Sequence, residues 1–233
     1  MKVYFVGAGP GDPKLVTVRG KELIENADLI VYAGSLVNPE VLSVAKGNKV
    51  DSYGMTLEQT TRVIVDACKQ GLCVVRLHSG DPTIYSAVRE QITALKPHNI
   101  DYEIVPGVSS VFASAAALGQ QLTSETLVIT RPSGRTLAED QLVELSDLKP
   151  TMAIVLGVDK IDRIMQRVRY APETPTSVVY HASWDDQIIV TGTVSDIATK
   201  AHKAGITKSA VILIGDELSP DGERRSYLYS PKN

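Results

Sequence analysis

The chain begins with a short apolar segment that runs directly into a glycine-rich turn. Residues 3–11 read V-Y-F-V-G-A-G-P-G, and Asp12-Pro13 follows. A buried strand that ends in such a turn is typical of the first strand of an open α/β sheet. In these sheets ligands bind at the carboxyl ends of the strands. The opening of the chain therefore predicts both the fold class and the edge of the sheet where a site should lie.

The turn lacks the glycine spacing of a dinucleotide-binding loop, which is G-x-G-x-x-G. Its glycines are Gly7, Gly9 and Gly11, and Asp12 stands where the third glycine of that pattern would be. A carboxylate there would repel a pyrophosphate bound at a helix N-terminus. The second predicted strand, residues 28–32, also ends without the acidic residue that binds the ribose. A nicotinamide-dependent oxidoreductase is therefore a disfavoured alternative.

Predicted strands and helices alternate along the chain, which indicates an α/β architecture. The strands expected in the first half are 3–6, 28–32, 73–77 and 102–105, and those in the second half are 126–130, 152–156, 177–181, 187–191 and 210–214. The pair Asp185-Asp186 separates two adjacent strands and predicts a hairpin, so the second half should be a mixed sheet. We expect two α/β domains, residues 1–118 and 119–233, with the active site in the cleft between them.

Composition excludes several classes of protein. The formal net charge is -3 and there is no block of like charges, so we expect no nucleic-acid partner. Cys68 and Cys73 form no framework, which favours a reducing compartment. No apolar stretch approaches the length of a membrane span and no signal peptide is recognisable, so we expect a cytoplasmic protein without a membrane partner. Histidines and cysteines are too few and too scattered for a zinc site, and we predict no metal.

Acid–base residues are sparse near the predicted strand ends. His78 and His181 each end a strand, and G-x-S-x-G is absent. This pattern disfavours the common hydrolases. Methyl transfer from a sulfonium fits better, because the donor already carries a good leaving group and alignment supplies much of the rate.

Four motifs carry a family resemblance. They are V-G-A-G-P-G-D-P at 6–13, S-G-D-P at 79–82, V-P-G-V-S-S at 105–110 and S-A-V-I-L-I-G at 209–215. In this order and spacing the chain resembles, over nearly its whole length, the tetrapyrrole methylases of the cobalamin and sirohaem pathways. The resemblance implies two α/β domains, S-adenosylmethionine as cofactor, a tetrapyrrole (precorrin) substrate and a homodimer.

Within that family the chain is most similar to the members that methylate carbon 11 of precorrin-4 or of its cobalt complex. The segments that indicate this are 32–37, 77–81, 130–136 and 182–184. Another tetrapyrrole methylase, acting on a different ring carbon, is the alternative within the family. Two departures from the family pattern are a short stretch between Leu122-Thr123 and Thr126, and Ser226-Tyr227-Leu228-Tyr229 near the end.

The resemblance also implies roles for individual residues. The cofactor should be bound by Ser79, Gly80, Asp81, Ile84, Ser109, Ser110, Leu156, Tyr180, His181, Ala182 and Ala210. The tetrapyrrole should contact Pro10, Gly11, Asp12 and Ser35, with Asp12 as catalytic base or as acceptor for a pyrrole N–H. Because the substrate is polyanionic and the chain is net acidic, we also assign Arg131 and Arg135 to substrate carboxylates.

Overall fold

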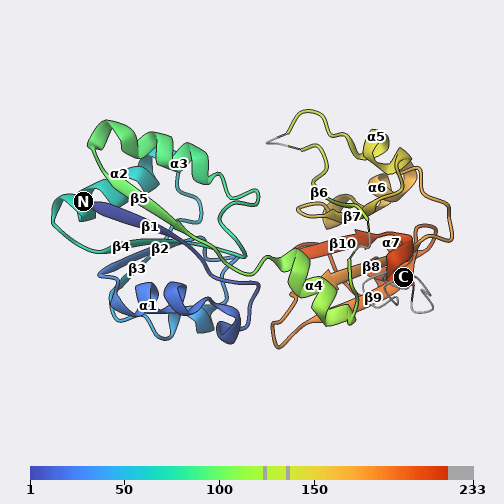
Figure 1. Ribbon diagram of the computed structural model, residues 1–233, viewed down its shortest axis with the longest axis horizontal. Helices are drawn as coiled ribbons and strands as arrows, with labels where there is room; N and C mark the ends of the chain where they lie inside the picture. The colour runs from blue at the N-terminus through green and yellow to red at the C-terminus, as the bar shows by residue number, and fades with distance from the viewer. Residues whose placement is uncertain (123–124, 135–136, 220–233) are drawn as a thin grey trace, which may run out of the picture. The chain divides into compact units, whose positions relative to one another are not determined.

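The computed structural model describes residues 1–122, 125–134 and 137–219, and the chain divides into two units, residues 1–110 and 111–233 (Figure 1). Each unit contains a five-stranded sheet of its own. The prediction of a two-domain α/β chain is thus confirmed.

The first unit is a parallel sheet with helices on both faces (Figure 1). Its strands, in the sheet order β3-β2-β4-β1-β5, are Asn48–Asp51, Leu29–Tyr32, Val74–His78, Lys2–Gly7 and Asp101–Val105. Its helices are α1 (Val18–Asn26), α2 (Leu57–Lys69) and α3 (Val88–Leu95), with short 3-10 turns η1 (Pro13–Leu15), η2 (Pro39–Leu42) and η3 (Lys96–His98). Side chains of alternate residues in β1 point to opposite faces of the sheet. Val6 packs with Ile24 of α1 on one face, whereas Phe5 packs with Ile64 of α2 on the other.

Helix ends in this unit follow local hydrogen bonding. Thr56 and Gln59 form a capping box at the start of α2, with bonds of 3.2 Å and 2.8 Å. Helix α1 begins after Thr17, whose Oγ1 accepts from the Gly20 amide at 3.1 Å. The residues before it form η1 instead.

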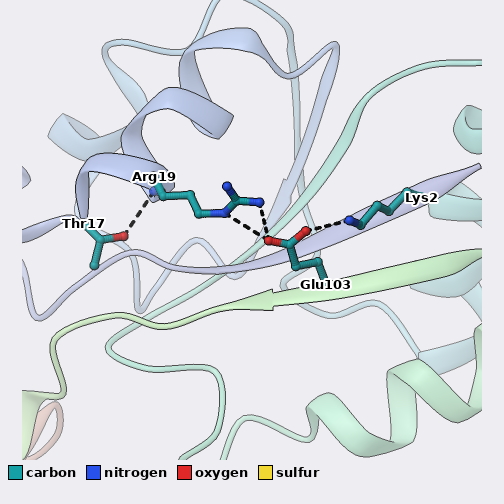
Figure 2. A network of polar contacts seen from close by, with 5 residues as sticks. Lys2, Thr17, Arg19 and Glu103 are labelled. Carbon is teal, nitrogen blue, oxygen red and sulfur yellow. Dashed lines mark hydrogen bonds and ion pairs between the residues drawn. The ribbon is translucent and has the colours of Figure 1, made fainter.

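A polar network ties the two strands at one edge of the sheet to α1 (Figure 2). Glu103 of β5 accepts a hydrogen bond from Lys2 Nζ of β1 at 2.6 Å and from Arg19 Nε of α1 at 3.0 Å. These bonds lower the pKa of Glu103. Since the charges face solvent, the network adds little to stability and mainly fixes the position of α1.

Strand β3 is absent from the sequence-based prediction. It reads N-K-V-D, and three of its four side chains are exposed. A strand at the edge of a sheet needs no apolar run, so neither alternation nor composition marks it. The structure places it beside β2, with Val31 paired to Val50.

The second unit is a mixed sheet, as predicted. Its strands, in the order β6-β7-β10-β8-β9, are Leu127–Thr130, Thr151–Ile154, Ala210–Ile214, Pro175–Tyr180 and Ile188–Thr193. Its helices are α4 (Ser110–Leu118), α5 (Leu142–Asp147), α6 (Ile161–Arg167) and α7 (Ile197–Lys203), with η4 (Val158–Lys160) and η5 (Asp216–Leu218). Strand β10 is antiparallel to β7 and β8, and β8 forms a hairpin with β9. Within the described part of the chain, no helix is long and apolar enough to cross a membrane.

Helix α4 packs on the second sheet. Val111 shares a buried cluster with Leu213 of β10, and Ala113 shares one with Val179 of β8. The two units therefore divide near the start of α4, whereas the sequence analysis places the domain boundary at its end. The small side chains of this alanine-rich helix allow the close packing that joins it to the second unit.

The loop before α5 is held by one buried carboxylate. Asp140 has a side chain that is 1% exposed, and it accepts from the Ser133 amide at 2.7 Å and from Arg167 Nη1 at 3.0 Å. Burial opposes ionisation of Asp140, but the hydrogen bonds from Arg167 and Ser133 outweigh it and the pKa lies well below its usual range.

We expect the substitution Asp140→Ala to destabilise the second unit by about 3 kcal/mol, because it leaves a cation and an amide without their acceptor. Since the folded-state pKa of Asp140 is depressed, the ion pair stabilises the wild type above the unfolded pKa of about 3.9. Its contribution is lost as the pH falls through the folded value. Urea unfolding followed by fluorescence of Trp184, the single tryptophan of the chain, measures this unit.

Asp147→Ala is the matched control. Asp147 pairs with Arg169 at 2.7 Å, but their side chains are 46% and 60% exposed. Because water screens this ion pair, Asp147→Ala should lower the free energy of unfolding by less than about 1 kcal/mol. Equal losses for the two variants would contradict the role given to Asp140.

Candidate functional site

The loops that follow β1, β4 and β5 meet at the carboxyl edge of the first sheet. These three strands are parallel neighbours, so their ends lie side by side. The Gly80 amide donates to Gly9 O at 2.8 Å, and the Gly9 amide donates to Gly80 O at 3.3 Å. The loop after β1 and the loop after β4, which the sequence analysis singled out separately, are thus bonded to each other.

The loops approach so closely that only glycine fits at the crossing. A Cβ added to Gly107 would lie 2.2 Å from Gly80 O and 2.8 Å from Gly7 Cα. Gly80 is different: an added Cβ would have no neighbour nearer than 3.7 Å, but its φ is +62°. Backbone conformation, rather than lack of space, requires glycine at position 80.

Asp81 holds the loop after β4 to the loop after β5. Its Oδ2 accepts from the Gly107 amide at 2.9 Å and its Oδ1 accepts from the Thr83 amide at 2.7 Å. Burial alone would raise the pKa of Asp81, but the bonds from Thr83 and Gly107 lower it. Both oxygens are engaged within the protein, so this loop presents its main chain to a ligand.

Four residues assigned to the tetrapyrrole, Pro10, Gly11, Asp12 and Ser35, lie in loops on the same edge. Asp12 Oδ1 accepts from the Lys14 amide at 2.8 Å and so caps η1. Gly11 O accepts from Asn38 Nδ2 at 3.1 Å, and Ser35 is exposed in the turn after β2. Hydrogen bonds therefore fix the backbone on both sides of Asp12.

His78 lies beneath this edge and is not exposed on it. The ring is 7% exposed and packs against Phe5, and Nε2 has no hydrogen-bond partner among the described residues. Burial, followed by the nearby charge of Arg76, lowers the pKa of His78 to about 3. Although His78 ends a strand at this edge, its side chain packs in the core of the first unit.

The second sheet also gathers predicted residues along one edge. Strands β6, β7 and β8 end there, and β10 begins there, since it runs antiparallel to its neighbours. The predicted residues at this edge are Arg131, Leu156, Tyr180, His181, Ala182 and Ala210. The His181 amide bonds Ser209 O at 3.2 Å, and the Val155 amide bonds Thr130 O at 3.0 Å.

Backbone strain concentrates at these edges. Leu156, His181, Ser183 and Ser209 have φ values of 55°, 46°, 70° and 52°, in the left-handed region that non-glycine residues rarely adopt. Each such residue costs about 1–3 kcal/mol, and such residues cluster at functional sites. Their concentration on one edge marks it as a candidate ligand surface.

The predicted residues at this edge differ in how exposed they are. Leu156 is 57% exposed, whereas Ala182 is 5% and Ala210 is 8% exposed. Ala182 packs with Ala113 and Val179. Leu156 is therefore accessible to a ligand at this edge, whereas the two alanines are almost fully covered.

An aromatic stack stands at the end of β8. The ring centroids of Tyr180 and His181 are 3.8 Å apart, and those of His181 and Trp184 are 4.4 Å apart. Asp186 bonds His181 Nδ1 through both oxygens, at 2.8 Å and 3.0 Å. Tyr180 and His181 are among the predicted cofactor residues, whereas Trp184 and Asp186 are not. The predicted hairpin at Asp185-Asp186 is the one sequence feature that marks the position of Asp186.

The predicted site residues thus fall into two groups, one on an edge of each sheet. Ser79, Ile84, Ser109 and Ser110 complete the group on the first sheet. Arg135 and the segment 226–229 lie outside the described residues. Among the described residues, no cluster of three or more His, Cys, Asp or Glu side chains could hold a metal ion.

The chain matches known proteins over almost its full length. A cobalt-precorrin-4 C(11)-methyltransferase of Methanocaldococcus jannaschii is 51% identical over 98% of this chain and 92% of the relative. The X-ray structure of a cobalt precorrin-4 methyltransferase, described as a cobalamin biosynthetic enzyme, superposes with a TM-score of 0.90 at 40% identity, covering 94% of this chain and 96% of that one.

A more distant structure was solved with a ligand. It is the uroporphyrin-III C-methyl transferase of Thermus thermophilus complexed with S-adenosylhomocysteine, with a TM-score of 0.80 at 28% identity over 94% of this chain and 99% of that one. The family model of the tetrapyrrole (corrin/porphyrin) methylases matches residues 2–198. The chain belongs to the tetrapyrrole methylases.

Proposed function

We propose that this protein is an S-adenosylmethionine-dependent methyltransferase that methylates carbon 11 of precorrin-4 or cobalt-precorrin-4 in cobalamin biosynthesis. The observation that carries the proposal is the 51% identity, over nearly the whole of both chains, to a relative named for that reaction. The glycine crossing and the strained second edge supply ligand surfaces of the kind that such a reaction needs.

The chemistry suits a site with few ionisable groups. A sulfonium donor needs no activation, so the protein contributes mainly alignment of the two reactants. The loops after β1, β4 and β5 are tied to one another through main-chain bonds and Asp81. A surface fixed in this way can hold two reactants without reorganising during the reaction.

We assign the cofactor to both groups of residues. On the first sheet these are Ser79, Gly80, Asp81, Ile84, Ser109 and Ser110, and on the second sheet Leu156, Tyr180, His181, Ala182 and Ala210. The bonding of Asp81 makes it a residue that shapes the cofactor loop through Gly107. The structure solved with S-adenosylhomocysteine supports the choice of cofactor.

The tetrapyrrole is assigned to Pro10, Gly11, Asp12 and Ser35, with Arg131 and Arg135 for its carboxylates. A carboxylate at position 12 would repel a phosphate but can accept a hydrogen bond from a pyrrole N–H. Arginine pairs with carboxylates through two parallel bonds.

We expect S-adenosylhomocysteine to bind and NADH and NADPH not to bind. Asp12 and the lack of an acid at the end of β2 disfavour a dinucleotide. Isothermal calorimetry with the three ligands measures this directly. Tight binding of NADH, together with no response to S-adenosylhomocysteine, would overturn the proposed function.

Two substitutions should separate the two glycine loops. Asp12→Ala should leave cofactor affinity nearly unchanged and lower turnover about 100-fold, because it removes the carboxylate that faces the tetrapyrrole. Gly80→Val forces a branched residue into φ +62°, at a cost of about 2 kcal/mol. If the loop must keep this shape to bind the cofactor, Kd should rise roughly thirtyfold.

Gly71→Val is the matched control for Gly80→Val. Gly71 has φ +81°, open space around it, and a position before β4 at the opposite edge of the sheet. The Gly71→Val variant should therefore suffer the same kind of backbone strain as Gly80→Val but keep the cofactor affinity of the wild type. Calorimetry and single-turnover rates test all three variants, with circular dichroism to confirm folding. Loss of cofactor binding in a folded Asp12→Ala protein would reverse the assignment of the two loops.

We also propose a cytoplasmic homodimer, as the family resemblance implies. Exposed apolar side chains on the first unit, Val18 at 77% and Leu36 at 47%, are consistent with a covered surface. Light scattering at micromolar concentration should give about twice the chain mass of 25.1 kDa. A mass near that of one chain would contradict the dimer.

A further inference from the structure

The turn after β2 is held by a residue of β3, the strand that the sequence does not predict. Asp51 ends β3, and its Oδ1 accepts from the Gly34 amide and from the Tyr53 amide, at 2.8 Å in both cases. One oxygen therefore joins the turn that carries Ser35 to the turn that follows β3. Because β2 and β3 are parallel neighbours, both turns lie at the carboxyl edge of the first sheet.

We propose that Asp51, together with Asn38, is a positioning residue for the tetrapyrrole, and that the two residues fix the turn of Ser35 in the shape that the substrate meets. The inference rests on the proposed function, which assigns Ser35 to the substrate. It goes further because it names the groups that set the shape of this part of the surface. The contacts that carry it all lie within the first unit.

The turn and the carboxyl group of Asp51 fit so closely that glycine is needed at position 34. A Cβ added to Gly34 would lie 2.2 Å from Asp51 Oδ2 and 2.8 Å from Asp51 Cγ. A larger residue would push the carboxyl group aside and break its bonds to the two amides. The φ of Gly34 is not positive, unlike that of Gly80. The contact with Asp51, rather than backbone conformation, therefore requires glycine there.

A buried polar network holds the ends of β2 and β3 together. Arg76 of β4 is 8% exposed, and it donates to Gln91 Oε1 at 2.8 Å and to Ser52 Oγ at 2.9 Å. Ser52 donates its amide and its hydroxyl to Tyr32 O, at 2.7 Å and 2.8 Å. Burial lowers the pKa of Arg76 to about 10, and the nearby charge of Asp51 opposes that change. The two strands are thus bonded to each other directly before their turns begin.

Asn38 anchors the other end of the same turn. Its Oδ1 accepts from the Glu40 amide at 3.0 Å and so caps η2, while its Nδ2 donates to Gly11 O at 3.1 Å. The second bond ties the loop after β2 to the loop after β1, which carries Asp12. Ser35 therefore lies between two anchored points, one bonded to β3 and the other to the loop of Asp12.

The variant Asp51→Ala removes the first anchor. We expect the KM for precorrin-4 to rise about tenfold, because a turn that is not held must be ordered when the substrate binds. The kcat should stay within about threefold of wild type, since the loss falls on substrate binding. The Kd of S-adenosylhomocysteine should not change. Steady-state rates at saturating S-adenosylmethionine measure KM and kcat, and calorimetry measures the Kd.

The variant Asp51→Asn is the conservative partner of Asp51→Ala. Its side-chain carbonyl oxygen can still accept from both amides, so its KM should stay within about threefold of wild type. Rescue of KM by asparagine identifies the acceptor oxygen, and not the bulk of the chain at position 51, as the group that matters.

Gly34→Ala tests the contact between the turn and the carboxyl group. In the wild-type background the added Cβ should displace Asp51 and raise KM about tenfold. In the Asp51→Ala background the space is free, so the same substitution should change KM by less than about twofold.

Asn38→Ser tests the second anchor. Serine can still cap η2, but it lacks the amide group that donates to Gly11 O. We expect KM for precorrin-4 to rise about fivefold or more, with an unchanged Kd of S-adenosylhomocysteine.

Asp28→Ala is the matched control for loss of a carboxyl anchor. Asp28 Oδ2 accepts from the Cys73 amide at 2.8 Å, and Asp28 precedes β2 at the opposite edge of the same sheet. Thermal unfolding followed by circular dichroism should show a loss of stability in both Asp28→Ala and Asp51→Ala. Only Asp51→Ala should change KM.

The outcomes separate this inference from the proposed function. A KM for Asp51→Ala near that of wild type would overturn the role of Asp51, as would an equal rise in KM for Asp28→Ala or an equal effect of Gly34→Ala in the two backgrounds. An unchanged KM for Asn38→Ser would overturn the second anchor. A wild-type protein that binds no S-adenosylhomocysteine and methylates no precorrin would instead overturn the proposed function.

Discussion

The close approach of three main-chain segments at Gly7, Gly80 and Gly107 is the constraint on which the first unit's site depends. A side chain at Gly107 would collide with the carbonyl of Gly80, so the three loops could not cross. The crossing lets Asp81 reach the Gly107 amide. The loops thereby form one rigid surface rather than three separate turns, and the main chain supplies its polar groups. Such a surface offers a ligand mainly main-chain groups, because the carboxylate of Asp81 is bonded to the Gly107 and Thr83 amides.

The second unit also has a fixed backbone at the edge of its sheet, but glycines are not what permits it. Its edge carries few glycines, and non-glycine residues such as Leu156 and His181 are held in the left-handed region. Packing must sustain that strain: Ala182 is buried against α4, and the His181 amide bonds Ser209 O. A glycine would relieve the strain at position 181 but would remove the ring. The sequence therefore accepts a conformational cost where a side chain is needed.

Most of the first unit could be predicted from the sequence because its signals are local. An apolar run that ends in Gly, Pro or Asp identifies each central strand, and parallel strands bring their ends together without further information. Sequence patterns fail to predict an element where tertiary contacts determine its structure. Strand β3 has an exposed N-K-V-D sequence, and α4 joins the second sheet through alanines that look alike on every face of the helix. His78 ends a strand as His181 does, yet only burial distinguishes them.

The two histidines also differ in the partners that the fold gives them. His78 has lost its solvent and lies near the charge of Arg76, so it stays neutral in the core. His181 has a carboxylate rather than a guanidinium as its neighbour, because Asp186 lies 2.8 Å from Nδ1. Desolvation beside a cation disfavours a protonated ring at His78. The same residue type at two strand ends is therefore a packing group in one unit, whereas in the other it bonds a carboxylate and stacks between two aromatic rings. Neither the local sequence nor the strand position carries that difference, since it arises from the partners that the fold supplies.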